Sequence, residues 1–525
     1  MAETASIKYH LHQAYLFGLM LLAASLTLSP FMMSVAQFWL VIVWIVDGVV
    51  GKDFKTKWGR FWHNKVAVLL VAFYLMHVVG LLWTSDFQYA MKDLRVKLPI
   101  LILPFIMSSM APLDRKRFNL VMQVYVFSVF VATLFSFSRY VRHDYVDVRE
   151  ISRFISHIRF CLHIVFCIAT IGYFLFTRKA PVWNRVIQVL MSLWFGYQVF
   201  IFESLSGYVI LVAVVIVSVF YALLRWKKGR GWCIALAVFT LAILVVGGVV
   251  FAQRIRPLLK IEAVDFSTLD QKTALGNDYW HDTIYNPVED GKFVGLYYCK
   301  QEMQAAWSQR SALPFDGTTR NGENLEATLS RYLTSKDLRK DAQGVMFLTD
   351  EDIQNIEQGI ANYNNWRHPG LHARLSSTLF EYNLYRRFNN PNGGSLSQRI
   401  EFTRASFHII RQHPCFGVGT GDVPLAFSQA YDEIHSPLWE EYRFRAHNQY
   451  LAIAVAFGCV GLAFFLVVLL YPYFSCKRNR TYLYTVFLCI MLLSMFPEDT
   501  LETQAGASLF AFFETLLLLT NPEES

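Results

Sequence analysis

The sequence predicts an all-α, polytopic membrane protein with about twelve transmembrane helices and one large, mostly helical extracytoplasmic domain between spans nine and ten. Of the 525 residues, 54% are hydrophobic and only 17% are charged, whereas a soluble chain of this length carries about a quarter charged residues. The apolar residues gather in stretches of about 20, the length that crosses the hydrocarbon core of a bilayer. The net charge of +8 is spread over short runs between these stretches. That pattern indicates membrane topology and excludes nucleic acid as the partner.

Twelve apolar segments qualify as spans in order along the chain. The first begins near Ala14 and lacks a basic n-region and a small-residue cleavage site, so we predict an uncleaved first helix. The predicted spans are residues 14–30, 32–50, 65–83, 97–111, 118–138, 157–177, 184–203, 206–224, 232–252, 448–473, 481–496 and 505–520.

The loops between the spans predict the orientation. One set is basic and the opposite set is mixed or acidic, as in Glu498 to Glu502. The positive-inside rule places the basic set and both termini in the cytoplasm. We therefore predict three parts: helices one to nine in residues 1–252, a periplasmic domain in 253–447, and helices ten to twelve in 448–525. The basic loops are Lys52–Lys65, Arg115–Arg117, Arg178–Lys179, Arg225–Arg230 and Lys477–Arg480.

The long polar segment reads as a folded domain. Thr349 followed by three acids predicts a capped helix, a second helix is expected from Ser395 to about Gln412, and no β pattern is evident. Cys299 and Cys415 would form a disulfide if the segment lies outside the cytoplasm and the two meet, and the sequence leaves this open. Adjacent acids at a helix start are ordinary capping charges, and we see no His/Cys ligand cluster outside the spans, so no metal is expected.

The stretch from Arg399 to Gly461 carries the most information. A helix with Arg399 and Arg404 is followed by His413-Pro414-Cys415-Phe416-Gly417-Val418-Gly419-Thr420-Gly421, by Arg445-Ala446-His447-Asn448, and by Gly458 and Gly461. This order resembles the O-antigen ligase and polymerase superfamily, bacterial membrane enzymes that move glycans from undecaprenyl pyrophosphate. The glycine run follows a helix and lacks the Lys-Ser/Thr of a phosphate loop, so we interpret it as a backbone turn. Gly458 and Gly461 share a helix face and are expected to serve helix packing.

The resemblance and the local chemistry together suggest roles for individual residues. His447 is the expected catalytic base, because the N-terminus of span ten and the neighbouring Arg443 and Arg445 disfavour a charged ring. The simpler alternative is that His447 and Asn448 only cap a helix at the membrane interface. A departure from the family is the segment 203–207, which has no Arg where some members carry one. The residues expected to hold the pyrophosphate of the donor are Arg399, Arg159, Arg445, Arg404 and His157, with Asn448 in support.

The resemblance implies an inverting, metal-independent glycosyltransferase without cofactors, most similar to the lipopolysaccharide O-antigen ligases. Its donor would be an undecaprenyl-pyrophosphate glycan, its acceptor a sugar hydroxyl of lipid A–core, and its site the periplasmic side of the bacterial inner membrane. Two rivals within the superfamily are a repeat-unit polymerase and a protein O-oligosaccharyltransferase. A polytopic transporter of lipid or glycan is the rival from another class, although transporters place ionisable groups near the midplane, where this chain has few.

Overall fold

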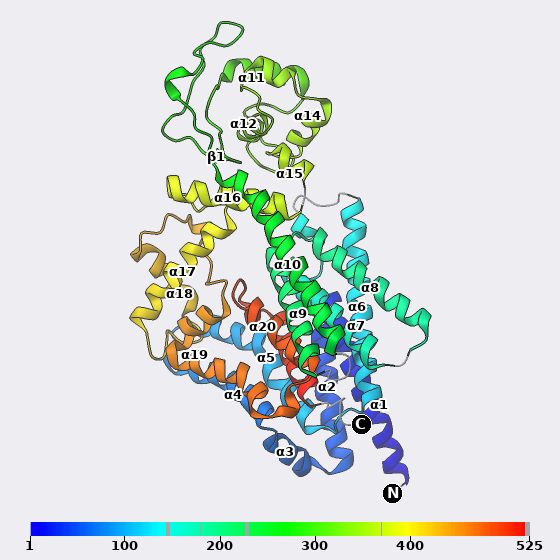
Figure 1. The fold of residues 1–525 in the computed structure, drawn as a ribbon. Helices are drawn as coiled ribbons and strands as arrows, with labels where there is room; N and C mark the ends of the chain where they lie inside the picture. Colours follow the sequence, from blue (N-terminus) through cyan, green and yellow to red (C-terminus); the bar gives the residue numbers. More distant parts are fainter. Residues whose placement is uncertain (1, 143–147, 179, 226–229, 369, 520–525) are drawn as a thin grey trace. The chain divides into compact units, whose positions relative to one another are not determined.

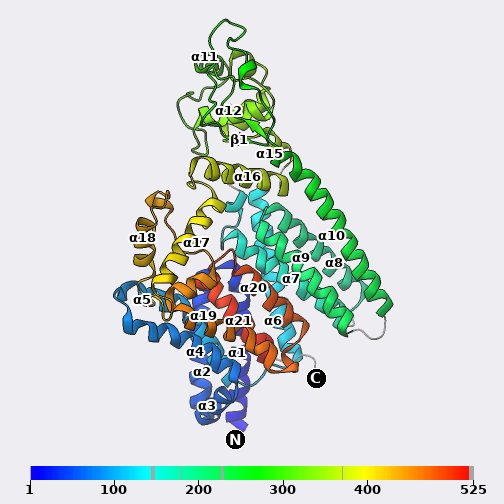
Figure 2. The same ribbon diagram turned by 60° about the vertical axis from the view of Figure 1, so that its left-hand side comes forward.

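The computed structural model describes residues 2–142, 148–178, 180–225, 230–368 and 370–519, and within these ranges helices make up nearly all of the regular secondary structure (Figures 1 and 2). It divides into two compact units. Unit 1 comprises residues 1–237, 402–436 and 443–525, and unit 2 comprises residues 238–401 and 437–442. The all-α, polytopic fold class is confirmed.

Unit 1 contains all of the predicted membrane helices except most of α10. Its elements are α1 (Ala2–Leu28), α2 (Pro30–Gly51), α3 (Phe54–His63), α4 (Lys65–Val79), α5 (Phe87–Ser109), α6 (Arg115–Val141), α7 (His157–Thr177), α8 (Val182–Ile201), α9 (Leu205–Arg225), the start of α10 (Arg230–Leu259), the end of α17 (Ser395–Gln412), α18 (Val423–Glu433), α19 (Gln449–Ser475), α20 (Tyr482–Ser494) and α21 (Gln504–Leu519). Two short 3-10 turns, η1 (Gly80–Trp83) and η6 (Thr500–Glu502), belong to connections near the candidate site.

Seven helices among the described residues are long and apolar enough to cross a membrane: α1, α2, α4 with η1, α6, α7, α9 and α19. The other five predicted spans also fall on helices, namely α5, α8, α10, α20 and α21, so the number twelve stays a prediction. The apolar segment of α7 is 72% buried inside the protein, but that of α9 only 17%. The uncovered apolar face of α9 needs lipid, because water would leave it in an unfavourable environment.

The core of unit 1 is formed by helices that are distant in sequence. α1 packs on α2 and α6, α21 on α5, and α7 on α8, α9 and α20. Phe513 of α21 lies fully buried, with its ring centroid 4.7 Å from that of Tyr125 and 4.9 Å from that of Phe166. The last span is therefore fixed at the centre of the bundle by aromatic packing.

Unit 2 is a small helical fold with its own core. Trp307, Leu329, Tyr332 and Ile356 are fully buried in one apolar cluster. The elements are the rest of α10, η3 (Phe266–Thr268), β1 (Val288–Glu289), β2 (Lys292–Phe293), α11 (Lys300–Arg310), α12 (Leu325–Ser335), α13 (Ala342–Met346), α14 (Asp350–Glu357), α15 (Tyr363–Arg367), α16 (Leu371–Phe388), the start of α17 and η4 (Glu440–Tyr442).

Two helices of the polar segment begin where the sequence predicts. Thr349 and Asp352 form a reciprocal capping box at the start of α14, and α17 spans Ser395–Gln412. The expectation of no β structure is wrong in one place, since β1 and β2 pair as a short antiparallel hairpin. Cys299 and Cys415 are both free thiols, and they belong to different units, so the disulfide that the sequence left open stays untested.

Parts of three predicted loops lie outside the described residues. These are residues 143–147 of the loop before α7, Lys179 of the basic loop after α7, and Lys227 and Lys228 of the basic loop after α9. The two units are defined by which residues pack together in the folded chain. The predicted boundaries at 252 and 447 instead mark where the chain would leave and re-enter the membrane. Those boundaries stay a prediction.

Candidate active site

Helix α19 is broken at Gly458, and the glycine-rich turn fills the break. Gly458 has φ 64° and ψ −164° inside the helix. The backbone amides of Val418 and Gly419 donate to the carbonyls of Val455 and Ala456 at 3.0 and 2.9 Å. Beyond the break, the amide of Cys459 donates to the Pro414 carbonyl at 2.8 Å. The turn thus supplies backbone partners that a broken helix loses.

This arrangement corrects the interpretation of the glycines. Gly458 does not offer a smooth face to a neighbouring helix, because a Cβ there would lie 2.3 Å from the backbone carbonyl of Cys415. Its positive φ is a conformation that glycine adopts without steric cost. Gly417 is enclosed in the same way, with a built Cβ 2.4 Å from the backbone of Phe457. The motif therefore fastens the turn of residues 414–421 to span ten.

His447 immediately precedes the N-terminal cap of α19. Asn448 is the cap, and its Oδ1 accepts a hydrogen bond from the amide of Leu451 at 3.0 Å. His447 has φ 45°, an uncommon value for a non-glycine residue that is often found at functional sites. Its ring packs near Phe402 and Phe444, with centroids 5.5 and 6.2 Å away. Asn448 therefore performs the capping, and the His447 side chain points elsewhere.

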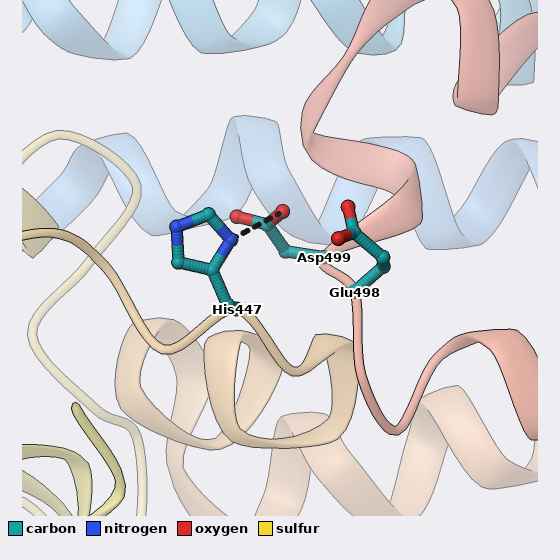
Figure 3. A group of neighbouring side chains, drawn as sticks. All are labelled: His447, Glu498 and Asp499. Carbon is teal, nitrogen blue, oxygen red and sulfur yellow. Dashed lines mark ion pairs between the residues drawn. The ribbon is translucent and has the colours of Figure 1, made fainter. Parts of the chain in front are cut away.

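The acidic connection between α20 and α21 faces His447. Figure 3 shows His447 directed toward Asp499, with Glu498 beside it. The Nδ1 atom of His447 lies 3.8 Å from Oδ1 of Asp499, and the two side chains are 35% and 5% exposed. One ligand-type atom from each of His447, Glu498 and Asp499 lies within 4.8 Å of the others. The premise that no such cluster exists outside the spans is thus wrong for the folded chain.

Both acids of this cluster also face arginines. Arg445 lies 3.3 Å from Oδ2 of Asp499, and Arg159 on α7 lies 3.5 Å from Oε2 of Glu498. Two guanidinium groups therefore compensate the two carboxylates. From the sequence, Arg443 and Arg445 are expected to disfavour a charged His447 ring. In the structure the carboxylate of Asp499 also lies next to the ring, and Arg443 pairs with Asp432 at 2.7 Å.

Arg445 continues into a buried charge network. It lies 3.2 Å from Oε2 of Glu502 and donates to the hydroxyl of Tyr89 at 3.1 Å. Glu502 in turn accepts from Lys97 at 2.8 Å, and Lys97 also contacts Asp93 one helical turn earlier. Each charge has an opposite partner, which is the condition for keeping such groups away from water.

The network has a defined electrostatic balance. Burial alone would lower the pKa of Arg445, but the carboxylates of Glu502 and Asp499 raise it above its ordinary value. Burial alone would raise the pKa of Glu502, and the charges of Lys97 and Arg445 hold it well below the usual range instead. Both groups are therefore charged at neutral pH, and Arg445 is held in place between two carboxylates.

Gln449 ties span ten to the acidic connection. Its Nε2 donates to Oε1 of Glu502 at 3.2 Å, its Oε1 accepts from the amide of Leu501 at 2.7 Å, and its backbone amide donates to the Met495 carbonyl at 2.9 Å. The side chain is fully buried. These bonds fix the segment that carries Asp499 against the segment that carries His447.

The structure brings together only part of the predicted site. His447, Arg445 and Arg159 meet around Glu498 and Asp499. Arg404 is exposed on the part of α17 that belongs to unit 1, and His157 is the first residue of α7. Arg399 lies on the part of α17 in unit 2 and is half-buried.

Four residues of this cluster were absent from the predicted set: Asp499, Glu502, Lys97 and Glu498. The acids stand together in a short connection between two apolar helices, which is a visible signal, because ionisable groups at span ends often mark a site. Lys97 and Asp93 are spaced four apart at the start of a predicted span, a spacing that places them on one helix face. Nothing in the sequence links these two signals to each other.

Comparison with known proteins adds one finding. A search among curated proteins found no match to this chain. Residues 351–466 match the family model described as O-antigen ligase, a segment that contains Arg399, the glycine-rich turn, His447 and Gly458. The predicted resemblance is thus confirmed: residues 351–466 form a segment that matches the O-antigen ligase family, which supports the O-antigen ligase superfamily.

Proposed function

We propose that this protein transfers a glycan from undecaprenyl pyrophosphate to a sugar hydroxyl of lipid A–core, on the periplasmic face of the inner membrane. The observation that carries the proposal is the His447–Asp499 pair, flanked by Arg445 and Arg159. His447 and Arg445 of this cluster belong to the segment that matches the O-antigen ligase family. The pair supplies a base for the acceptor hydroxyl, and the arginines supply charge for a pyrophosphate leaving group. No step requires a nucleotide sugar, since the lipid pyrophosphate is already an activated leaving group.

His447 acts as the general base. Asp499 faces Nδ1, so we assign the proton of the acceptor hydroxyl to Nε2. The carboxylate orients the ring and stabilises the imidazolium that forms when the proton is taken up. Phe402 and Phe444 limit the ring's rotation from the other side.

The reaction is a single displacement with inversion. The acceptor oxygen forms a bond to the anomeric carbon, the bond from that carbon to the pyrophosphate oxygen breaks, and the proton passes to His447. Undecaprenyl pyrophosphate leaves with the electron pair. Positive groups stabilise the negative charge that develops on the phosphate, and guanidinium suits this task through paired hydrogen bonds.

Arg159 is the strongest candidate for this contact among the described residues. Its Nε atom is buried and has no hydrogen-bond partner in the described part of the chain, so it has a donor to offer an incoming anion. We assign Arg445 to the same anion, and Arg399 on the strength of the sequence resemblance. Arg404 on the same helix and His157, beside Arg159 at the start of α7, are assigned to the pyrophosphate as further polar groups.

The proposed mechanism is metal-independent. His447, Glu498 and Asp499 have a donor set that a divalent ion accepts. However, Arg159 and Arg445 already compensate both carboxylates, and a cation would have to displace them. We therefore assign the acids to orienting the arginines and His447.

A deletion strain tests the function. Its lipopolysaccharide gel should show naked core, with glycan accumulating on the undecaprenyl carrier. Core bearing a single repeat unit would instead indicate a repeat-unit polymerase. Intact lipopolysaccharide with underglycosylated protein would indicate a protein O-oligosaccharyltransferase, and glycan retained on the cytoplasmic face would indicate a transporter.

A further inference from the structure

Unit 2 contains a pocket of about 490 Å³ that the proposed chemistry does not use. It lies among α12, α15, α16 and the loop that follows α16, all within the one unit. Its volume falls in the range of about 300–1,000 Å³ that small-molecule sites occupy. The lining is rich in carboxamides and includes one phenyl ring: Asn321, Asn362, Asn365, Asn390, Asn392 and Phe380.

Carboxamides are the side chains that match sugar hydroxyls. Each offers two donors and an acceptor on a fixed plane, and a sugar hydroxyl both donates and accepts. Asn392 is held in position, because its Oδ1 accepts from the amide of Trp439 at 2.9 Å and its Nδ2 donates to the carbonyl of Pro437 at 3.2 Å. The orientation of the Asn392 carboxamide in the pocket wall is therefore fixed before a ligand binds.

Asn365 carries an unused acceptor in this pocket. Its Nδ2 lies 3.4 Å from Oγ of Ser377, but its Oδ1 is buried and accepts no hydrogen bond within the described part of the chain. A buried acceptor without a donor is unfavourable. A hydroxyl of a bound ligand would satisfy it.

The charges of the lining disfavour an anion. Arg331 is bound by Glu289 through two hydrogen bonds of 2.8 Å, and its guanidinium lies 4.2 Å from the ring centroid of Phe380. Its charge is thus compensated, while Glu323 and Glu381 add two carboxylates to the wall. A phosphate or sulfate would meet net negative charge, whereas a neutral sugar would not.

We propose that this pocket binds a neutral oligosaccharide, and so holds glycan at a second place, separate from the residues that carry the transfer chemistry. The inference rests on the proposed function, since the same chemistry is offered by the glycan of the donor and by the core sugars of the acceptor. In either case the pocket would raise the occupancy of one substrate without touching the reacting atoms.

Binding to the full-length purified protein tests the proposal. The probes are the delipidated glycan repeat and the core oligosaccharide, both released by mild acid, with inorganic pyrophosphate as the anionic probe. Saturation-transfer NMR should detect one of the two sugars, and an excess of inorganic pyrophosphate should not displace it. Asn365→Ala should weaken that binding about fivefold and Ser377→Trp should abolish it. Asn364→Ala, on the same helix but outside the lining, should leave it unchanged.

Transfer kinetics then show whether the bound sugar belongs to the donor or to the acceptor. They also distinguish a failure of the pocket proposal from a failure of the proposed function. Asn365→Ala should raise the KM for the donor or for the acceptor, whichever sugar binds, with kcat unchanged. Absence of sugar binding in the wild type, or binding that survives both pocket variants, overturns the inference even if transfer is normal. Sugar binding in a protein that transfers no glycan overturns the proposed function and leaves the pocket standing. Unchanged thermal unfolding of Asn365→Ala establishes that the variant is folded.

Discussion

In the proposed mechanism, the chemistry of His447 depends on Asp499. Its carboxylate faces both Nδ1 of His447 and the guanidinium of Arg445. These two contacts restrict the position of the Asp499 side chain. Asn at this position keeps the shape but removes the charge that stabilises the imidazolium. The sequence left Asp499 unassigned, because 51 intervening residues separate it from His447 and only folding brings the two together.

We expect Asp499→Asn to lower kcat for glycan transfer by about 10- to 100-fold, as part of the general-base contribution. The acidic limb of the pH–rate profile should also move to lower pH, because the imidazolium loses its neighbouring negative charge. Asp432→Asn is the matched control, since Asp432 is likewise paired with an arginine. A lower rate with an unmoved profile would mean that Asp499 has a structural role only.

Lys340 makes the stability of folded unit 2 depend on pH, and the direction of this dependence follows from its burial. Its Nζ is buried and donates to the Leu296 carbonyl, and burial lowers the pKa of Lys340 to about 7. The folded pKa lies below the unfolded value, so the destabilising effect is fully present below pH 7. It declines as pH rises toward the unfolded value of about 10.4.

Lys340→Met should therefore protect unit 2 from thermolysin at pH 7, with the advantage over the wild type shrinking toward pH 9. Lys336→Met is the contrasting variant, because Lys336 pairs with Asp352 at 2.6 Å and its loss should increase cleavage. An advantage for Lys340→Met that is equal at both pH values would contradict the assignment of a buried, uncompensated lysine.

At the level of elements, the sequence predicts helices better than it predicts their interruptions. The bounds of α17 and the capped start of α14 follow from local signals, namely a proline after the helix and a threonine followed by acids. The break in α19 does not, because Gly458 stands in an apolar run that reads as one continuous span. Only the hydrogen bonds from residues 414–419 reveal that the helix is shared with a turn.

Gly458→Ala should destabilise the protein by about 1–3 kcal/mol or more, because it combines a positive φ with a clash against the Cys415 backbone. Thermal unfolding of the purified protein measures the effect. Gly196→Ala on α8 is the control, since no atom lies within 4 Å of its built Cβ, and it should be neutral or slightly stabilising. Equal melting temperatures for the two variants would refute the role of the break.

At the scale of the whole molecule, hydropathy predicts the fold class because lipid selects apolar residues locally, span by span. Hydropathy does not predict the charge network of Lys97, Glu502 and Arg445, because its members belong to three segments that meet only in the folded bundle. Orientation stays a prediction from the basic loops.

Single cysteines in a cysteine-free protein test the orientation. A cysteine replacing Gln343, which is exposed in unit 2, should react with a membrane-impermeant thiol reagent on spheroplasts. A cysteine replacing Arg478, in the basic loop after α19, should react only after the membrane is permeabilised. The reverse pattern would place the polar domain in the cytoplasm and remove the periplasmic site from the proposal.

The rate of glycan transfer by purified, reconstituted protein tests whether His447 is the general base of a metal-independent transfer. With undecaprenyl-pyrophosphate glycan, lipid A–core and excess EDTA, the wild type should form the ligated product. His447→Ala should be slower by about 10²–10⁴-fold at unchanged folding. His435→Ala is the matched control, because His435 also has a positive φ and is exposed, and it should retain the wild-type rate. Near-normal transfer by His447→Ala would contradict its role as the general base. No transfer by the wild type until a divalent ion is restored would contradict the metal-independent mechanism.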